Sequence, residues 1–159
     1  ILAASHLSIG QVHEAQQQFP QALADYQTAL QKLHFTFKSS DIYQNPQDFD
    51  NAVSKLDLFK ALRQKAAAFQ KYYLLNKQNP HLEAALQTSQ TAIRLAEHLR
   101  LSYDSDEAKL FFSEQVFPVY EQAVTAAFLL FEKTGKSGYA EQAFLLSEQS
   151  KAAVLAESL

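Results

Sequence analysis

The sequence contains no cysteine, and this absence excludes several classes of site. Disulfide bridges and thiolate metal sites both require cysteine, so neither can form in this chain. A cysteine nucleophile is excluded for the same reason. A chain without cysteine fits a reducing compartment, and we therefore expect a cytoplasmic location.

Residues that interrupt helices are also scarce. The chain has three glycines and four prolines among 159 residues, and 47% of its residues are apolar. Long helices are easy to build from such a sequence, and this length can bury a core of its own. We expect one folded domain.

The sequence lacks a strong charge of either sign and lacks long apolar runs. Fourteen basic and 17 acidic residues give a net charge of −3, and the basic residues are scattered. Such a chain has no positive electrostatic potential strong enough to hold a phosphate backbone, so we expect no nucleic acid partner. No apolar run approaches the ~20 residues that span a bilayer, and the first residues lack a signal-peptide pattern. We expect no membrane association.

The apolar residues that are present repeat every three or four positions. One such series contains Phe59, Leu62, Ala66, Phe69 and Tyr73. This spacing places them on one face of a helix, and strand-like alternation is missing. The sequence therefore predicts an all-α fold.

Prolines and glycines indicate where the helices begin and end. The expected helices span approximately 1–16, 19–35, 56–77, 80–101, 105–133 and 138–158. Short connections pair them into antiparallel hairpins at about 1–35, 56–101 and 105–158. We expect a short helix at about 47–53 to interrupt the linker 36–55. Pro118 lies within the fifth helix, where we predict one bent helix and not two.

The second helix of each pair carries mostly small residues at one repeated spacing. These residues are Ala22, Tyr26 and Ala29, then Ala85, Ser89 and Ala92, then Ala143, Ser147 and Ser150. Small side chains allow a neighbouring helix to approach closely, as in stacked helical hairpins. We predict that Ala85 and Ala92 are buried, and that Tyr26 is buried with its hydroxyl on a polar partner.

The first pair, "LSIGQVHEAQQQFPQALADYQTAL", resembles a tetratricopeptide repeat (TPR). The matching residues are Ile9, Gly10, Phe19, Ala22, Tyr26 and Ala29. The match is partial, because His6, His13 and His34 replace the usual tryptophan, tyrosine and proline. The resemblance implies a right-handed α-α superhelix of about three antiparallel hairpins.

The remainder of the chain resembles the repeat region that precedes bacterial CHAT domains, which are caspase-like cysteine peptidases or degenerate relatives. The similar segments are "DIYQNP", "LFKALRQKAAAF", "LEAALQTSQTAIRLAEHLR", "EAKLFFSEQVFPVYEQAV" and "YAEQAFLLSEQSKAAVLAESL". In that family the last segment is the helix before the linker to the peptidase. The resemblance implies that this chain is a fragment of a longer one. The CHAT domain itself is absent, because its catalytic dyad needs a cysteine and this sequence has none.

Three patterns that resemble enzyme sites have structural explanations. "TGKS" at 134–137 lacks the earlier glycine of a phosphate-binding loop, since Leu130 stands there, and Gly135 is typical of a helix end. Ser147 and Lys151 lie one helical turn apart without oxyanion donors or a glycine-rich loop. The five histidines lack carboxylates at ligand spacing. We expect no catalytic residue, cofactor or metal.

We predict a non-catalytic protein–protein interaction or scaffolding module that positions or regulates a C-terminal CHAT domain. Candidate partner-binding residues are Leu7, Gln11, Tyr72, Val154 and Leu155. Related repeats clamp a C-terminal carboxylate with a lysine and an asparagine on their first helices. Leu7 and Gln11 occupy the matching positions here, so that clamp is not expected. Val154 and Leu155 should form an exposed apolar strip on the last helix. Alternatives are a stand-alone TPR-type peptide-binding adaptor, a sensor that occludes a peptidase, or an enzyme with an unrecognised site in the helical groove.

Overall fold

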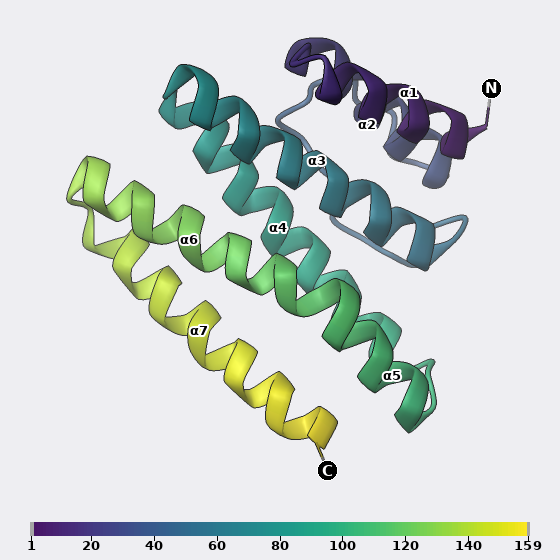
Figure 1. Cartoon of the computed structure of the whole chain (residues 1–159). Helices are drawn as coiled ribbons and strands as arrows, with labels where there is room; N and C mark the ends of the chain where they lie inside the picture. Colours follow the sequence, from purple (N-terminus) through teal and green to yellow (C-terminus); the bar gives the residue numbers. More distant parts are fainter. Residues whose placement is uncertain (1, 159) are drawn as a thin grey trace.

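The computed structural model describes residues 2–158, which form helices joined by turns and one long linker (Figure 1). The elements are α1 (Ala3–Ala15), α2 (Phe19–Leu33), α3 (Lys55–Asn76), α4 (Asn79–Arg100), α5 (Ser105–Phe111), a π-helical turn (Phe112–Val116), α6 (Phe117–Thr134) and α7 (Ser137–Ser158). The described residues contain no β-strand, and the all-α prediction is confirmed. No helix within this range is both long and apolar enough to cross a bilayer.

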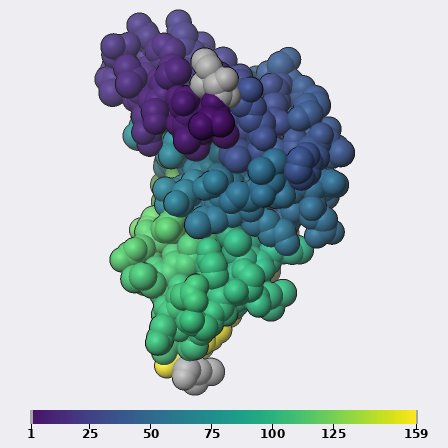
Figure 2. All heavy atoms as spheres, turned by 90° about the vertical axis from the view of Figure 1, so that its right-hand side faces the viewer, coloured from purple at the N-terminus to yellow at the C-terminus, as the bar shows by residue number. Residues whose placement is uncertain are grey.

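The helices pack as hairpins that follow one another in chain order. α1 packs on α2, α3 on α4, and α6 on α7, while α2 also packs on α3 and α4 on α6. The first hairpin and the linker lie at one end and the α5–α6 region at the other (Figure 2). α1, α3 and the α5–α6 helix are hereafter the first helices of the hairpins, and α2, α4 and α7 the second helices.

Pro118 lies in a helix that continues from Ser105 to Thr134 through the π-helical turn. Phe117 keeps helical geometry, with φ −58° and ψ −37°. Proline clashes with the carbonyl four residues earlier, and the wider π-helical turn directly before it relieves that crowding. The prediction of a single helix is confirmed, whereas the π-helical turn was not expected.

The linker does not contain the short helix predicted at 47–53, and that prediction is wrong. His34 and Ala52 instead form an isolated antiparallel bridge. Phe49 is buried, and its ring meets the ring of His98 edge-on with centroids 5.2 Å apart. A tertiary anchor therefore fixes this segment, and its apolar residue is not part of a helical face.

The predicted small-residue contacts are present in the first two hairpins. Ala85 and Ala92 are fully buried, which confirms that prediction. Tyr26 is also fully buried, and its hydroxyl donates to Glu14 Oε1 at 2.8 Å, as predicted. In the third hairpin Ser147 is only half-buried, because it lines a hollow between α6 and α7.

Candidate functional site

A groove of about 300 Å³ lies where the first helices of all three hairpins meet. Its polar lining comes from α1 (Gln11 and Glu14), α3 (Arg63, Gln64 and Lys71) and α6 (Gln122). Arg63, Ala67 and Lys71 are four residues apart, so α3 presents them on one face. We call this surface the first-helix groove.

Glu14 ties three helices together at one end of this groove. Its carboxylate accepts the Tyr26 hydroxyl from α2 and forms an ion pair with Lys71 of α3. Burial of the ring, together with the neighbouring Glu14 carboxylate, raises the pKa of Tyr26 well above its ordinary value. Tyr26 therefore stays protonated and serves as a hydrogen-bond donor.

Arg63 supplies a positive charge further along the groove. Its Nη1 donates to Gln115 Oε1 at 3.1 Å, and its guanidinium lies 6.0 Å from the centroid of the Phe59 ring. Partial burial lowers the pKa of Arg63, although a guanidinium remains charged at neutral pH. The adjacent Gln64 Oε1 is buried without a hydrogen-bond partner among the described residues. The groove thus offers a guanidinium to a bound polypeptide, and the Gln64 side chain beside it has an acceptor that no described residue uses.

Only one of the candidate residues from the sequence lies in this groove. Gln11 lines it. Leu7 is half-buried and packs against both parts of the apolar core. Tyr72 is half-buried, and its ring is stacked between Phe19 at 5.5 Å and His81 at 4.0 Å, measured between ring centroids. Tyr72 therefore serves packing between α2, α3 and α4.

Sequence reasoning missed the groove residues of α3. Arg63, Gln64 and Lys71 lie on α3, and the four-residue steps from Arg63 to Ala67 and from Ala67 to Lys71 were the available signal. That signal does not say which other helices contribute, because Gln11 and Gln122 lie far away along the chain.

Val154 and Leu155 of α7 are 49% and 66% exposed, as predicted for the last helix. Phe144, at 64%, lies nearly on the same helix face as Leu155. Lys151 stands between them on that face, and its Nζ pairs with Glu148 at 3.0 Å. On that face Lys151 therefore separates Phe144 from Leu155.

The residues that suggested enzyme chemistry lie in separate places. His13 Nδ1 pairs with Asp25 Oδ2 at 2.6 Å, and His34 Nε2 donates to the Asp48 carbonyl at 3.0 Å. Within the described chain, no three histidine or acidic side chains gather as a metal-binding group. Gly135 has φ 67° and ends α6, which confirms the helix-end interpretation of "TGKS".

Comparison of the chain with protein-family models, with curated proteins and with solved structures finds no match. The geometry of the grooves and exposed patches therefore carries the functional argument. The first-helix groove combines contributions from three hairpins, a guanidinium and the Gln64 amide, whose oxygen has no hydrogen-bond partner among the described residues, and this combination is suited to binding.

Proposed function

We propose that this chain is a non-catalytic protein-binding module and that the first-helix groove holds a segment of its partner. The observation that carries this proposal is the shared groove itself, to which each hairpin contributes its first helix. Arg63 supplies a complementary group for acidic side chains, and the Gln64 amide, which lines the groove, is of the kind that pairs with backbone groups. A partner segment would contact all three hairpins at once.

We also propose that the hairpins form a TPR-like right-handed superhelix. The packing of α2 on α3 and of α4 on α6 supports it, because each second helix then joins its hairpin to the next. The buried Ala85 and Ala92 allow the close approach that such stacking needs. In a superhelix of this kind the first helices line the inner face, where the groove lies.

In the intact protein, we propose that the module positions or regulates a C-terminal caspase-like CHAT domain. The sequence resemblance supports this assignment, and the exposed Val154 and Leu155 supply an apolar contact surface. The protein sequence after residue 159 tests it, since a caspase-like histidine and cysteine pattern is expected there. A stand-alone adaptor would use the same groove without that pattern.

Selection from a displayed library of random 12-residue peptides tests the groove. We expect the selected peptides to lose about ten-fold or more in affinity for the double variant Arg63→Ala/Gln64→Ala, since buried polar contacts to a ligand are lost. Lys32→Ala is the matched control, because Lys32 is exposed on α2 and does not line this groove. Failure to select any peptide, or equal binding to the double variant, would contradict the proposal.

A further inference from the structure

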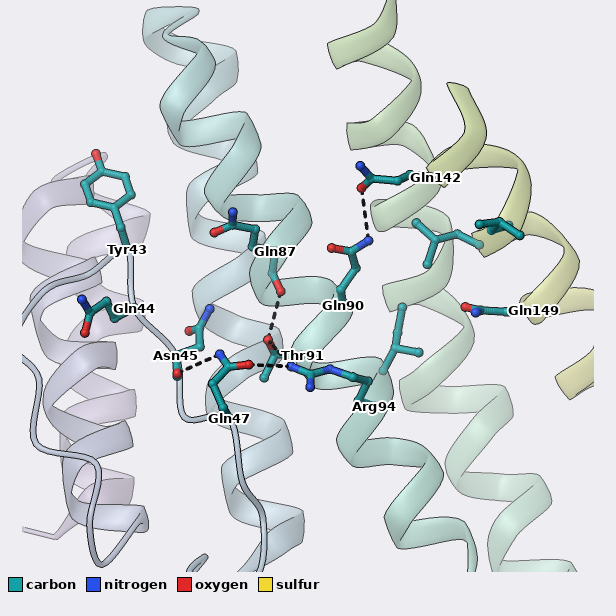
Figure 3. A pocket seen from close by; sticks show the side chains of 13 residues that line it. Tyr43, Gln44, Asn45, Gln47, Gln87, Gln90, Thr91, Arg94, Gln142 and Gln149 are labelled. Carbon is teal, nitrogen blue, oxygen red and sulfur yellow. Dashed lines mark hydrogen bonds between the residues drawn. The ribbon is translucent and has the colours of Figure 1, made fainter. Parts of the chain in front are cut away.

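A second and larger groove, of about 780 Å³, lies between α4, α7 and the linker residues 43–47 (Figure 3). It is formed by second helices and shares no lining residue with the first-helix groove. Its volume falls within the range of about 300–1,000 Å³ found for ligand sites. We call it the amide groove, after the side chains that line it.

Primary amides dominate this lining. They make up seven of the 13 lining residues, and four of the seven lie on the facing helices, namely Gln87 and Gln90 on α4 and Gln142 and Gln149 on α7. Each amide carries both a carbonyl acceptor and an NH₂ donor. An extended peptide backbone presents the same two groups in alternation, so amides can pair with it independently of the peptide sequence.

Among the described residues that line the groove, Arg94 is the only one with a charged side chain. It is exposed, and its Nη2 donates to Gln47 Oε1 at 3.2 Å and to Thr91 Oγ1 at 3.4 Å. Among residues 2–158 it forms no ion pair. The groove therefore presents one positive charge among neutral donors and acceptors, which is complementary to a single carboxylate.

The linker wall of the groove is held in place from within the core. Lys65 Nζ donates to the Gln44 carbonyl and to Asn45 Oδ1, each at 2.8 Å, and Asn45 Nδ2 donates to Thr88 Oγ1 at 3.1 Å. Because the wall is already fixed, it loses little conformational entropy when a ligand binds. On the open side, Gln90 Nε2 donates to Gln142 Oε1 at 3.3 Å, a long bond that a ligand can replace.

The two helical walls also match in length. Gln87 and Arg94 are seven residues apart on α4, as are Gln142 and Gln149 on α7. Seven helical residues rise about 10.5 Å, which about three residues of extended chain also span. Leu145, 57% exposed, lies between the α7 amides and offers an apolar contact.

From this juxtaposition we infer that the amide groove binds an extended polypeptide segment that carries an acidic side chain. The groove amides pair with its backbone, Arg94 binds its carboxylate and Leu145 packs against an apolar side chain. This is a second site, on a different face from the first-helix groove, so the module holds two segments at once.

The probe is an array of random hexapeptides with one position fixed as glutamate, or as glutamine in the matched uncharged set. The glutamate peptides that bind best, each with its matched glutamine peptide, are then titrated against the whole chain by fluorescence anisotropy. We expect glutamate peptides to bind more tightly, and Arg94→Gln to weaken them about three- to five-fold while glutamine peptides are unaffected. Arg94→Lys keeps the charge and should keep the preference for glutamate.

Two further measurements separate this site from the first-helix groove and from loss of structure. N-methylation of the peptide backbone should weaken binding of both the glutamate and the glutamine peptides, because it removes the N–H groups that donate hydrogen bonds to the amide oxygens of the groove. Arg63→Gln should change neither. The proposal would be overturned if Arg94→Gln weakened the glutamate and the glutamine peptides equally, or if the parent chain showed no preference for glutamate peptides. If binding of the glutamate peptides depended on Arg63 and not on Arg94, the proposal for the amide groove would be wrong, whereas the proposal for the first-helix groove would remain.

Discussion

Gly10 of α1 lies so close to the ring of Tyr26 in α2 that a Cβ carbon at position 10 would stand 2.4 Å from Cε1 of the ring. The ring cannot easily move aside, since Tyr26 is fully buried and its hydroxyl is held by Glu14. The first hairpin therefore needs a glycine at this crossing.

We expect Gly10→Ala to destabilise the chain by about 1–2 kcal/mol. The overlap with a buried ring exceeds the gain in helix propensity from alanine. Urea unfolding measures the difference. Gly138→Ala in α7 is the control, because nothing lies within 4 Å of a Cβ there and the change should be neutral or stabilising by up to about 1 kcal/mol. A neutral Gly10→Ala would show that the hairpin can open without cost.

Ala85 gives a second test of helix packing. It is fully buried where α4 meets its neighbours, so Ala85→Leu should overpack the contact and destabilise by about 1–3 kcal/mol. Ala24 of α2 is exposed, and Ala24→Leu should change stability by less than about 0.5 kcal/mol. Thermal and urea unfolding of the two variants provide the comparison. Equal effects would mean that Ala85 does not lie at a close helix contact.

Much of the fold could be predicted from the sequence because local patterns determine it. Apolar residues at helical spacing, such as Phe59, Leu62 and Ala66, predict the helix and its buried face. Gly135 ends α6 as expected for a glycine in left-handed geometry. The burial of Ala85 and Ala92 also follows from a pattern within one helix.

The linker and the two grooves could not be predicted in this way, because contacts between distant residues determine them. Phe49 belongs to a segment with helix-compatible spacing, yet its contact with His98 fixes another conformation. Lys65 looked like an ordinary charged residue of α3, although it is completely buried beneath the linker. Arg94 reads as solvated helix surface until α7 and the linker are placed beside it.

Val154 and Leu155 lead to a prediction about association. Because both are exposed, we expect Val154→Ser/Leu155→Ser to change the free energy of unfolding by less than about 0.5 kcal/mol. Exposed apolar patches drive association, so sedimentation should show weak, concentration-dependent self-association of the parent chain that the variant lacks. Phe128→Ser, at another exposed apolar site on α6, is the control and should leave association unchanged. A parent chain that stays monomeric at every concentration would contradict this role for the patch.

Lys65 is the buried charge whose titration should be visible in the stability of the whole chain. Its Nζ is surrounded by neutral acceptors, of which Gln27 Oε1 lies at 2.7 Å, and the more distant Asp41 is the acidic group that favours its charged form. Burial dominates and lowers the pKa of Lys65 to about 7, from 10.5 in the unfolded chain. Between these two values the unfolded chain binds a proton that the folded chain has lost.

The sign of the pH dependence follows from that difference. Stability contributed through Lys65 should rise with pH from about 7 toward 10, and be lost as pH falls through the folded-state pKa, with a slope of up to about 1.4 kcal/mol per pH unit. Urea unfolding at pH 7.5, 8.25 and 9.0 measures the slope. Lys65→Met removes the titrating group, so its slope should be flatter by that amount even though loss of the linker contacts lowers its stability at each pH. Lys71→Met, at an exposed lysine of the same helix, should keep the parent slope. If the parent and Lys65→Met chains show the same slope, Lys65 stays charged in the fold and its oxygen ligands outweigh burial.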